Sequence, residues 1–189
     1  SPAMHNRAFA ELGLDFVYLP LEVEDLAQFV DHFVRPATRE VDCKMRGVSV
    51  TIPHKSAIIP LLDEVNESAR RIGAVNTVVV DQGRLIGYNT DVRGAMGPLE
   101  QVCNLRGEKC GVIGAGGAAR AVIYGLLERG ALVEVFARNA VLASSLNEAF
   151  GVTVSPIESL VSSDVRVVIN TTPVGMRGHS EGSSPVPAQ

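Results

Sequence analysis

The sequence lacks three features that would each assign it to a broad class of protein. No apolar run approaches the ~20 residues that span a bilayer, which predicts a protein without a membrane segment. Basic residues are not in excess, because the net charge is -4, and this argues against a nucleic-acid or anionic-membrane surface. Cys43, Cys103 and Cys110 are odd in number and fit neither a disulfide framework nor a zinc pattern. We therefore expect no metal site, and reduced cysteines in a cytoplasmic protein.

What is present fits a globular enzyme or binding protein. The 189 residues allow one large domain or two small ones, and the 46% hydrophobic content supplies enough apolar side chains for real cores. The chain starts at Ser1 without a targeting segment or a lead-in strand, and residues 181–189 form a polar tail rich in Pro and Ser. We expect the natural protein to be longer at both ends.

Residues 112–120, which read Val-Ile-Gly-Ala-Gly-Gly-Ala-Ala-Arg, carry the clearest motif. A β-branched pair leads directly into the glycines, and residues 118–128 have the pattern of a helix. Glycine lets the backbone turn sharply and approach a ligand, while the helix start directs N–H groups and a positive dipole at it. Ala119 stands where the third glycine of the usual fingerprint would be, a replacement that the fingerprint tolerates. The motif predicts a dinucleotide-binding turn, with an ordinary tight turn as the alternative.

Around this turn, strand and helix patterns alternate, which predicts an α/β fold. In the first half we expect an α/β domain with a mostly parallel sheet, and in the second half a Rossmann-like domain. The expected helices of the first half are 2–12, one capped by Asp25, 55–65 and 91–103, and its expected strands are 16–23, 47–52, 74–80 and 85–88, the last two joined by a hairpin at 81–84. The second half should contain strands at 109–113, 132–137, 152–155 and 165–170, with helices at 118–128 and 142–150.

Three polar segments of the first half lie at strand ends, where α/β sheets place their ligands. They are residues 49–55, 73–77 and 87–91. Thr51 and Lys55 come from the first of these segments, Asn76 from the second and Asp91 from the third.

Each of these residues also has a structural explanation. Lys55 fits a solvated lysine in the first turn of a helix, although the helix dipole disfavours a cation there. Asp91 fits an N-cap, and Asn76 fits a turn residue. His54 fits an exposed or packing histidine better than a catalytic base.

Taken together, six motifs resemble those of the shikimate dehydrogenase family in order and spacing. They are residues 1–6 (Ser-Pro-Ala-Met-His-Asn), 50–55 (Val-Thr-Ile-Pro-His-Lys), 74–77 (Ala-Val-Asn-Thr), 87–91 (Gly-Tyr-Asn-Thr-Asp), 114–120 (Gly-Ala-Gly-Gly-Ala-Ala-Arg) and 170–176 (Asn-Thr-Thr-Pro-Val-Gly-Met). The resemblance covers nearly the whole chain. It implies a two-lobed enzyme, with a substrate-binding and catalytic domain at 1–104 and an NADP-binding domain, incomplete at its C-terminus, at 105–189.

The resemblance also implies an activity and residue roles. The family interconverts 3-dehydroshikimate and shikimate with NADP, a step of aromatic amino acid biosynthesis. Lys55 and Asp91 would be the catalytic pair, and the hydrogen-bond partners of the substrate would be Ser1, Thr51, Asn76 and Asp91. The dinucleotide would contact Gly114, Ala115, Gly116, Gly117, Ala118, Arg138, Thr171 and Met176. A nearby ammonium suits this reaction, because hydride addition to a ketone builds alkoxide charge.

The choice of cofactor depends on the residue that follows the second strand of the dinucleotide-binding half. An acidic residue there binds the ribose hydroxyls of NAD, whereas a basic residue accommodates the 2′-phosphate of NADP. Arg138 occupies this place, which favours NADP, with a surface arginine as the alternative. A further basic residue that the family usually has three positions after residue 139 is Leu142 here.

Other departures leave alternatives open. A family serine just upstream of Ser1 is missing, and Ser49 replaces the usual asparagine. A quinate or quinate/shikimate dehydrogenase shares most of these motifs. A third alternative is a regulator that binds a dinucleotide but catalyses no reaction. Such a protein has no use for both Lys55 and Asp91. The partners expected are a small-molecule substrate, no nucleic acid and no membrane, in a monomer or a homodimer.

Overall fold

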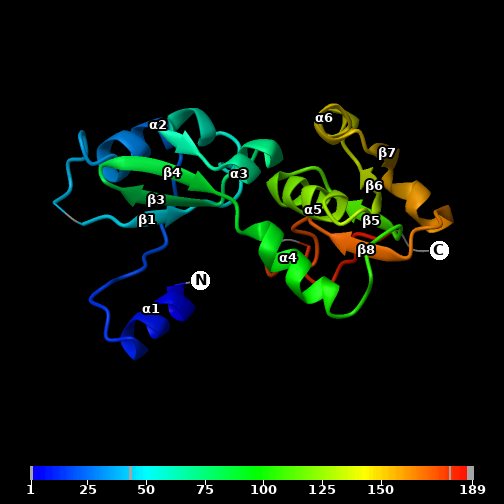
Figure 1. The fold of residues 1–189 in the computed structure, drawn as a ribbon, viewed down its shortest axis with the longest axis horizontal. Helices are drawn as coiled ribbons and strands as arrows, with labels where there is room; N and C mark the ends of the chain where they lie inside the picture. Colours follow the sequence, from blue (N-terminus) through cyan, green and yellow to red (C-terminus); the bar gives the residue numbers. More distant parts are fainter. Residues whose placement is uncertain (1, 43, 179, 187–189) are drawn as a thin grey trace.

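The computed structural model describes residues 2–42, 44–178 and 180–186. In this part of the chain, two four-stranded sheets lie at the two ends of the molecule, with α3, α4 and α5 between them (Figure 1). The elements up to the link between the sheets are α1 (Pro2–Glu11), α2 (Leu26–Phe29), the π-helix η1 (Val30–Val34), β1 (Gly47–Ser49), the 3-10 helix η2 (Ile59–Leu61), β2 (Glu64–Val65), α3 (Glu67–Ile72), β3 (Thr77–Asp81), β4 (Arg84–Tyr88) and α4 (Asp91–Glu100). The remaining elements are β5 (Lys109–Ile113), α5 (Gly117–Leu127), β6 (Leu132–Ala137), α6 (Ala140–Phe150), β7 (Thr153–Pro156), the 3-10 helix η3 (Ile157–Ser162) and β8 (Val167–Asn170).

The second sheet, which we call sheet B, has the strand order β7-β6-β5-β8 among the described residues, and its pairings are all parallel. This confirms the α/β fold with a parallel sheet that the alternation of strands and helices predicted. Its order equals 3-2-1-4 in chain sequence, as in a dinucleotide-binding half. The order reverses between β5 and β8, so the glycine turn after β5 and the segment after β8 flank the switch point where such sheets bind ligands.

The core of sheet B has two layers. On one face, α5 buries Ile123 and Leu126 against Val112 and Val135 of the strands, together with Leu146 of α6. On the other face, Ile113 and Phe136 contact the residues of η3. Both faces are therefore covered, which explains why its strands read as apolar runs and were predicted correctly.

The first sheet, sheet A, has the order β1-β3-β4-β2 in the described residues. Two of its three pairings, β1 with β3 and β3 with β4, are antiparallel, and only β2 with β4 is parallel. The prediction of a mostly parallel sheet is wrong for this part of the chain. The cause is the short hairpin at residues 81–84, which was itself predicted: a connection this tight can join only antiparallel strands.

Two further predictions for the first half are wrong. Residues 16–23 do not form a strand, because their backbone lacks a strand neighbour; Tyr18 instead exchanges hydrogen bonds with the Asn6 side chain at 2.7 and 2.9 Å. Residues 55–65 do not form one helix: turns lead to η2, which includes Pro60, and β2 follows. The predicted N-cap Asp25 is confirmed, since its side chain accepts a hydrogen bond from the Gln28 backbone at 2.9 Å.

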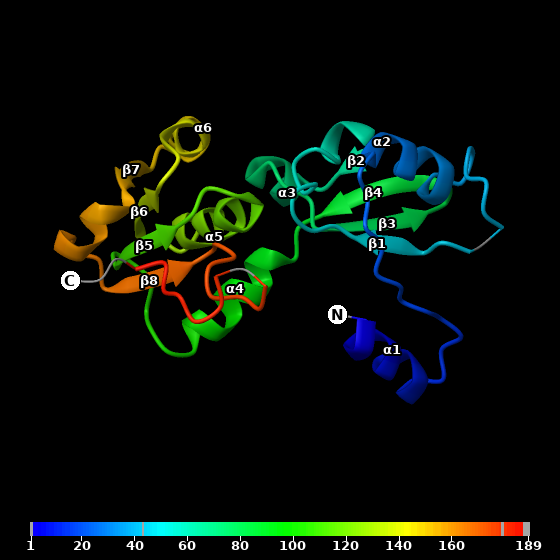
Figure 2. The same ribbon diagram turned by 180° about the vertical axis from the view of Figure 1, so that it is seen from behind.

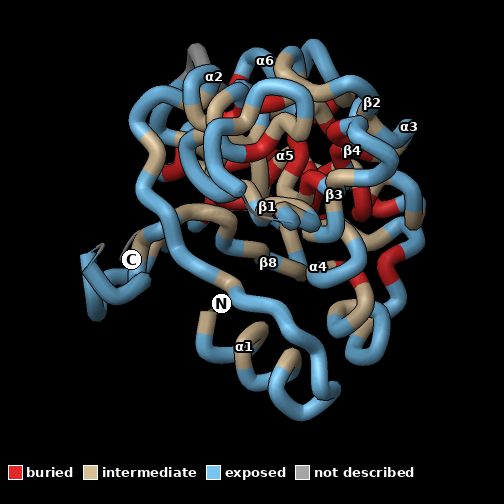
Figure 3. Tube along the Cα trace, turned by 90° about the vertical axis from the view of Figure 1, so that its left-hand side faces the viewer, coloured by how far each residue is buried: buried red, intermediate tan, exposed pale blue. Residues whose placement is uncertain are grey.

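Helix α1 lies apart from the rest of the molecule and is joined to it by an extended segment (Figures 1 and 2). It contains no buried residue (Figure 3). In the described residues, burial begins at Val30 in the π-helix η1. Throughout the part of the chain that the structure describes, no helix combines the length and the apolar character needed to cross a membrane.

Candidate functional site

Lys55 and Asp91, predicted from separate polar segments, meet in the structure. Lys55 lies in the turns that follow β1, and Asp91 is the first residue of α4. The Lys55 Nζ donates a hydrogen bond to Asp91 Oδ2 at 2.6 Å. The two side chains are only 14% and 29% exposed, so this ion pair is shielded from solvent more than a surface pair.

Asn76 holds the other oxygen of the same carboxylate. Its Nδ2 donates to Asp91 Oδ1 at 2.7 Å and to Thr90 Oγ1 at 2.9 Å, while its Oδ1 accepts from the Thr90 backbone N–H at 2.9 Å. The N-cap of α4 is Thr90, which makes no side-chain cap. The structural explanation of Asp91 as an N-cap is therefore wrong: its carboxylate faces Lys55 and Asn76.

Backbone pairing near the ends of the sheet A strands brings these three side chains together. The Asn76 N–H donates to Tyr88 O at 3.0 Å, and Asn76 O accepts from the Val50 N–H at 2.7 Å. Val75 N–H in turn donates to Lys55 O at 2.7 Å. Three polar segments that are distant in the chain thus converge at one edge of the sheet.

The glycine turn connects β5 to α5 at the switch point of sheet B. Gly114 has φ +112°, and a Cβ there would lie 2.8 Å from Thr171 Oγ1, so only glycine fits without strain. Thr171 fastens β8 to the same turn by donating to Ile113 O at 2.6 Å. Gly116 is the N-cap of α5 and has no side chain, so the first-turn N–H groups of this helix, including that of Ala118, can meet a ligand.

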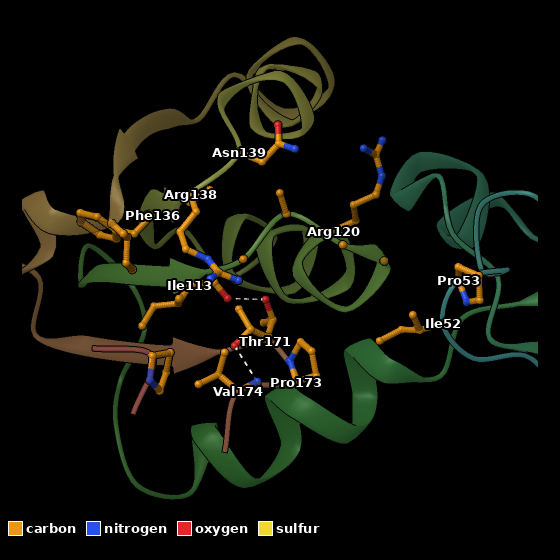
Figure 4. Close-up of a pocket in the computed structure, with 18 of the residues that line it drawn as sticks. Ile52, Pro53, Ile113, Arg120, Phe136, Arg138, Asn139, Thr171, Pro173 and Val174 are labelled. Atoms are coloured by element: carbon orange, nitrogen blue, oxygen red, sulfur yellow. Dashed lines mark hydrogen bonds between the residues drawn. The ribbon is translucent and has the colours of Figure 1, made fainter. Parts of the chain in front are cut away.

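A pocket of about 1110 Å³ joins the two groups of residues, since Lys55 and the glycine turn both line it. A Cβ on Gly117 would lie 3.1 Å from the Cβ and Cδ of Lys55, so the two chain segments touch. Figure 4 shows the pocket between the end of sheet B and the segment that carries Ile52 and Pro53. The residues that line it include Ile52, Pro53, Lys55, Ser56, Ile113, Gly114, Ala115, Gly116, Gly117, Arg120, Phe136, Ala137, Arg138, Asn139, Ser145, Ile157, Thr171, Thr172, Pro173, Val174, Ser180, Ser183, Ser184 and Pro185.

The charges around this pocket are of one sign. Among the described residues that line it, Lys55, Arg120 and Arg138 are cationic and none is acidic. Arg138 follows β6, and its side chain extends towards Ile113 and Thr171 at the end of sheet B (Figure 4). Because Lys55 is paired with Asp91, Arg138 and the positive end of α5 are the groups that favour an anionic ligand such as a phosphate ester.

Two further predicted site residues, Thr51 and Met176, are not among the residues that line this pocket. Thr51 is exposed and lines a second, more apolar pocket between residues 15–23 and β1. Met176 is 58% exposed. His54 bonds to Val23 O through Nε2 at 2.9 Å, which agrees with the structural explanation. Ser1 lies outside the described residues.

Sequence reasoning did not assign a role to Arg120 or to Ser56, although both line the pocket. Arg120 belongs to the glycine motif itself, and its place on the first turn of the helix gave a signal that it could reach the site. No sequence pattern pointed to Ser56, because residues 55–65 were predicted as a helix. In the described part of the chain, three or more His, Cys, Asp or Glu side chains never gather in a group that could hold a metal ion.

Comparison with known proteins identifies similar chains along the whole length. Residues 1–78 match the family model described as the shikimate dehydrogenase substrate binding domain. The shikimate dehydrogenase (NADP(+)) of Carboxydothermus hydrogenoformans is 44% identical over 93% of this chain and 64% of its own length. That of Pelobacter propionicus is 41% identical over 100% of this chain and 67% of its own length.

Among solved structures, shikimate 5-dehydrogenase from Thermus thermophilus in complex with NADP(H) and shikimate superposes with a TM-score of 0.79. It is 39% identical in sequence, and the match covers 98% of this chain and 67% of that one. The chain thus spans roughly two thirds of the length of its relatives, and 64% of the first two.

The shielded Lys55–Asp91 pair predicts an energetic coupling that an exposed pair would lack. In a double-mutant cycle with Lys55→Met and Asp91→Asn, urea unfolding should give a coupling of about 1.5–3 kcal/mol, the range for hydrogen bonds to charged groups. The matched control is the Arg84–Glu64 pair, at 2.9 Å but 57% and 49% exposed, whose cycle with Arg84→Met and Glu64→Gln should give less than about 1 kcal/mol. Equal couplings in the two cycles would contradict the structure's account of the pair.

Proposed function

Because this chain belongs to the shikimate dehydrogenase family, we propose that the protein catalyses the reversible, NADP-dependent reduction of 3-dehydroshikimate to shikimate, a step of aromatic amino acid biosynthesis. One observation carries the proposal: Lys55, which is hydrogen-bonded to Asp91, lines the same pocket as the glycine turn. A regulator that only binds a dinucleotide would not require a shielded ammonium–carboxylate pair there.

Four features of the pocket suit a dinucleotide. Its volume of about 1110 Å³ is ample for a ligand of this size, and the glycine turn presents backbone without side chains. The start of α5 has N–H groups that suit a pyrophosphate, and we propose that Arg138, which lines the pocket, pairs with the 2′-phosphate. The proposed contacts are Gly114, Ala115, Gly116, Gly117, Ala118, Arg138, Thr171 and Met176. When bound, NADP(H) supplies or accepts the hydride.

Lys55 would act as the proton donor. As the carbonyl carbon at C3 becomes tetrahedral, negative charge develops on its oxygen, and the Lys55 ammonium stabilises that charge and transfers one proton to it. The oxidation direction returns the proton from the hydroxyl to Lys55. Asp91 holds the ammonium in one orientation, because its Oδ2 accepts a hydrogen bond from Lys55 Nζ at 2.6 Å. Asn76 holds the second carboxylate oxygen at 2.7 Å and thereby fixes the orientation of Asp91.

The substrate is a polyhydroxylated acid, and each buried polar group left without a partner costs about 1–3 kcal/mol. We propose that Ser1, Thr51, Asn76 and Asp91 supply the hydrogen bonds. In the same proposal, residues 1–104 form the substrate-binding domain and residues 105–189 the NADP-binding domain of a two-lobed cytoplasmic enzyme. Support comes from the segregation of sheet A and sheet B along the chain and from the matched substrate-binding model over residues 1–78.

The direct test is cofactor reduction by the full-length protein, followed at 340 nm with shikimate or quinate against NADP or NAD. We expect shikimate with NADP to give the highest kcat/KM of the four combinations. Preference for quinate would assign the protein to the quinate-oxidising relatives. Absence of turnover in every combination, with the dinucleotide still bound, would overturn the enzymatic proposal.

Replacing Lys55 tests its role in chemistry. Lys55→Ala should lower kcat by roughly 10²–10⁴-fold, the range for a positioned acid–base group, and should change KM far less. Lys109→Ala, which removes an exposed lysine on β5, is the matched control and should leave kcat within about twofold. A Lys55→Ala protein that retains more than a third of the wild-type kcat would remove Lys55 from the mechanism.

Arg138 is predicted to distinguish the two dinucleotides. Arg138→Ala should weaken NADP binding by about 1.5–3 kcal/mol, because a hydrogen bond between charged groups is lost, and should hardly change NAD binding. Isothermal titration with each dinucleotide measures the difference, with Arg106→Ala, an exposed arginine of the linking turn, as the control. An equal loss for both dinucleotides would mean that Arg138 supports the loop or contacts the adenine instead.

A further inference from the structure

The first turn of α5 meets the Lys55 region through two residues that lie three positions apart on one helix face. Gly117 touches the Lys55 side chain, where an added Cβ would lie 3.1 Å from the Cβ and Cδ of Lys55. Arg120 donates a hydrogen bond from Nε to Ile72 O, at the end of α3, at 2.7 Å. A single helix turn therefore contacts both Lys55 and a neighbouring segment of the first half.

The Arg120 guanidinium is enclosed on several sides. It lies over the Phe150 ring, with Cζ 5.3 Å from the ring centroid. Gly73 is a further neighbour, since a Cβ there would lie 2.8 Å from Arg120 Nη2. The φ of Gly73, +70°, also favours glycine. This burial lowers the pKa of Arg120 from its ordinary value. Figure 4 shows the side chain extending from α5 towards α3, away from Arg138.

The segment that Arg120 contacts also holds Lys55. The Ser56 hydroxyl donates to Gly73 O at 2.9 Å, and the Val75 N–H donates to Lys55 O at 2.7 Å. Residues 72–75 are therefore bonded to Arg120 through Ile72 O. They are bonded to Ser56 and Lys55 through Gly73 O and the Val75 N–H. A shift of this segment relative to α5 would move Lys55 relative to the glycine turn.

We propose that Arg120 is a positioning residue for the reaction: its bond to Ile72 O and its contact with Gly73 hold residues 72–75, and through them Lys55, in a fixed place against the glycine turn. This inference rests on the proposed function. Arg120 does not need to touch substrate or cofactor for this role, because it acts through the segment that carries Lys55.

The test compares Arg120→Met with Arg71→Met in the full-length protein. Methionine keeps most of the length of arginine but removes every N–H donor. Arg71 is the matched control, because it also links α3 to α5: it lies 5.2 Å from the Tyr124 ring and 3.4 Å from Glu128. It contacts neither residues 73–75 nor Lys55 in the interactions that the structure describes.

We expect Arg120→Met to lower kcat by about 10–100-fold, since a misplacement of about 1 Å can cost as much as 10²-fold. The KM for NADPH should change by less than about threefold. The primary isotope effect with 4-deuterated NADPH should rise towards its intrinsic value, because hydride transfer becomes slower than product release. Arg71→Met should leave kcat and the isotope effect unchanged, even if both variants lose similar stability to urea.

Two further measurements keep the inference testable if Arg120→Met folds poorly. Gly73→Ala places a methyl group against the guanidinium, adds strain to a backbone with φ +70°, and should also lower kcat. In the double variant the two effects should not add, because both act through one contact. In the protein without ligands, amide hydrogen exchange of residues 72–76 should be faster in Arg120→Met than in Arg71→Met.

The outcomes separate this inference from the proposed function. If the wild-type protein does not turn over shikimate, the proposed function fails, and hydrogen exchange alone decides whether Arg120 holds residues 72–76. If the wild-type protein is active and Arg120→Met matches Arg71→Met in kcat, isotope effect and exchange, the positioning role is overturned. A rise in the KM for NADP(H) of more than tenfold with an unchanged kcat would instead make Arg120 a cofactor-binding residue and would also overturn the inference.

Discussion

The contact between Lys55 and Gly117 is the constraint on which the rest of the site depends. A Cβ on Gly117 would lie 3.1 Å from the lysine stem, so a residue without a side chain lets α5 begin this close to the ammonium. The contact places a group from the edge of sheet A beside the helix start that follows β5. Without it, the Lys55–Asp91 pair and the glycine turn would be two unrelated features of two sheets. With it, Lys55 and the glycine turn line one pocket.

The charged groups of the site also differ between the side of sheet A and the side of sheet B. On the side of sheet A, the Lys55 ammonium donates a hydrogen bond to Asp91, and the other Asp91 carboxylate oxygen accepts one from the Asn76 amide. The cation is therefore held in one orientation. On the side of sheet B, Arg138 and the start of α5 face the pocket, and the described lining contains no acidic residue. A balanced pair suits proton transfer, in which the charge of the lysine changes, whereas an unbalanced positive surface suits the retention of phosphate groups.

The sequence was most informative where structure depends on local patterns. The strands and helices of the second half were predicted almost to the residue, because both faces of a parallel sheet are buried and its strands read as apolar runs. The first half was harder. The direction of its strands depends on pairing between distant segments, residues 16–23 lack a strand neighbour, and Pro60 interrupts the expected helix. Lys55 and Asp91 were nevertheless singled out by the polar segments 49–55 and 87–91 and by their resemblance to family motifs, and the structure brings the two side chains together at 2.6 Å. Arg120 was not assigned a role, since its partner Ile72 O is a backbone group that no motif records.

The central claim is that one ammonium, carried by the first half of the chain, serves the reacting centre of a dinucleotide held by the second. A crystal structure of the full-length protein with NADP and shikimate tests it most directly. The account predicts the nicotinamide C4 about 3–3.5 Å from the substrate C3, with Lys55 Nζ about 2.6–3.2 Å from the C3 oxygen and still bonded to Asp91. A complex in which Lys55 lies beyond hydrogen-bond reach of that oxygen, with the nicotinamide in place, would contradict it.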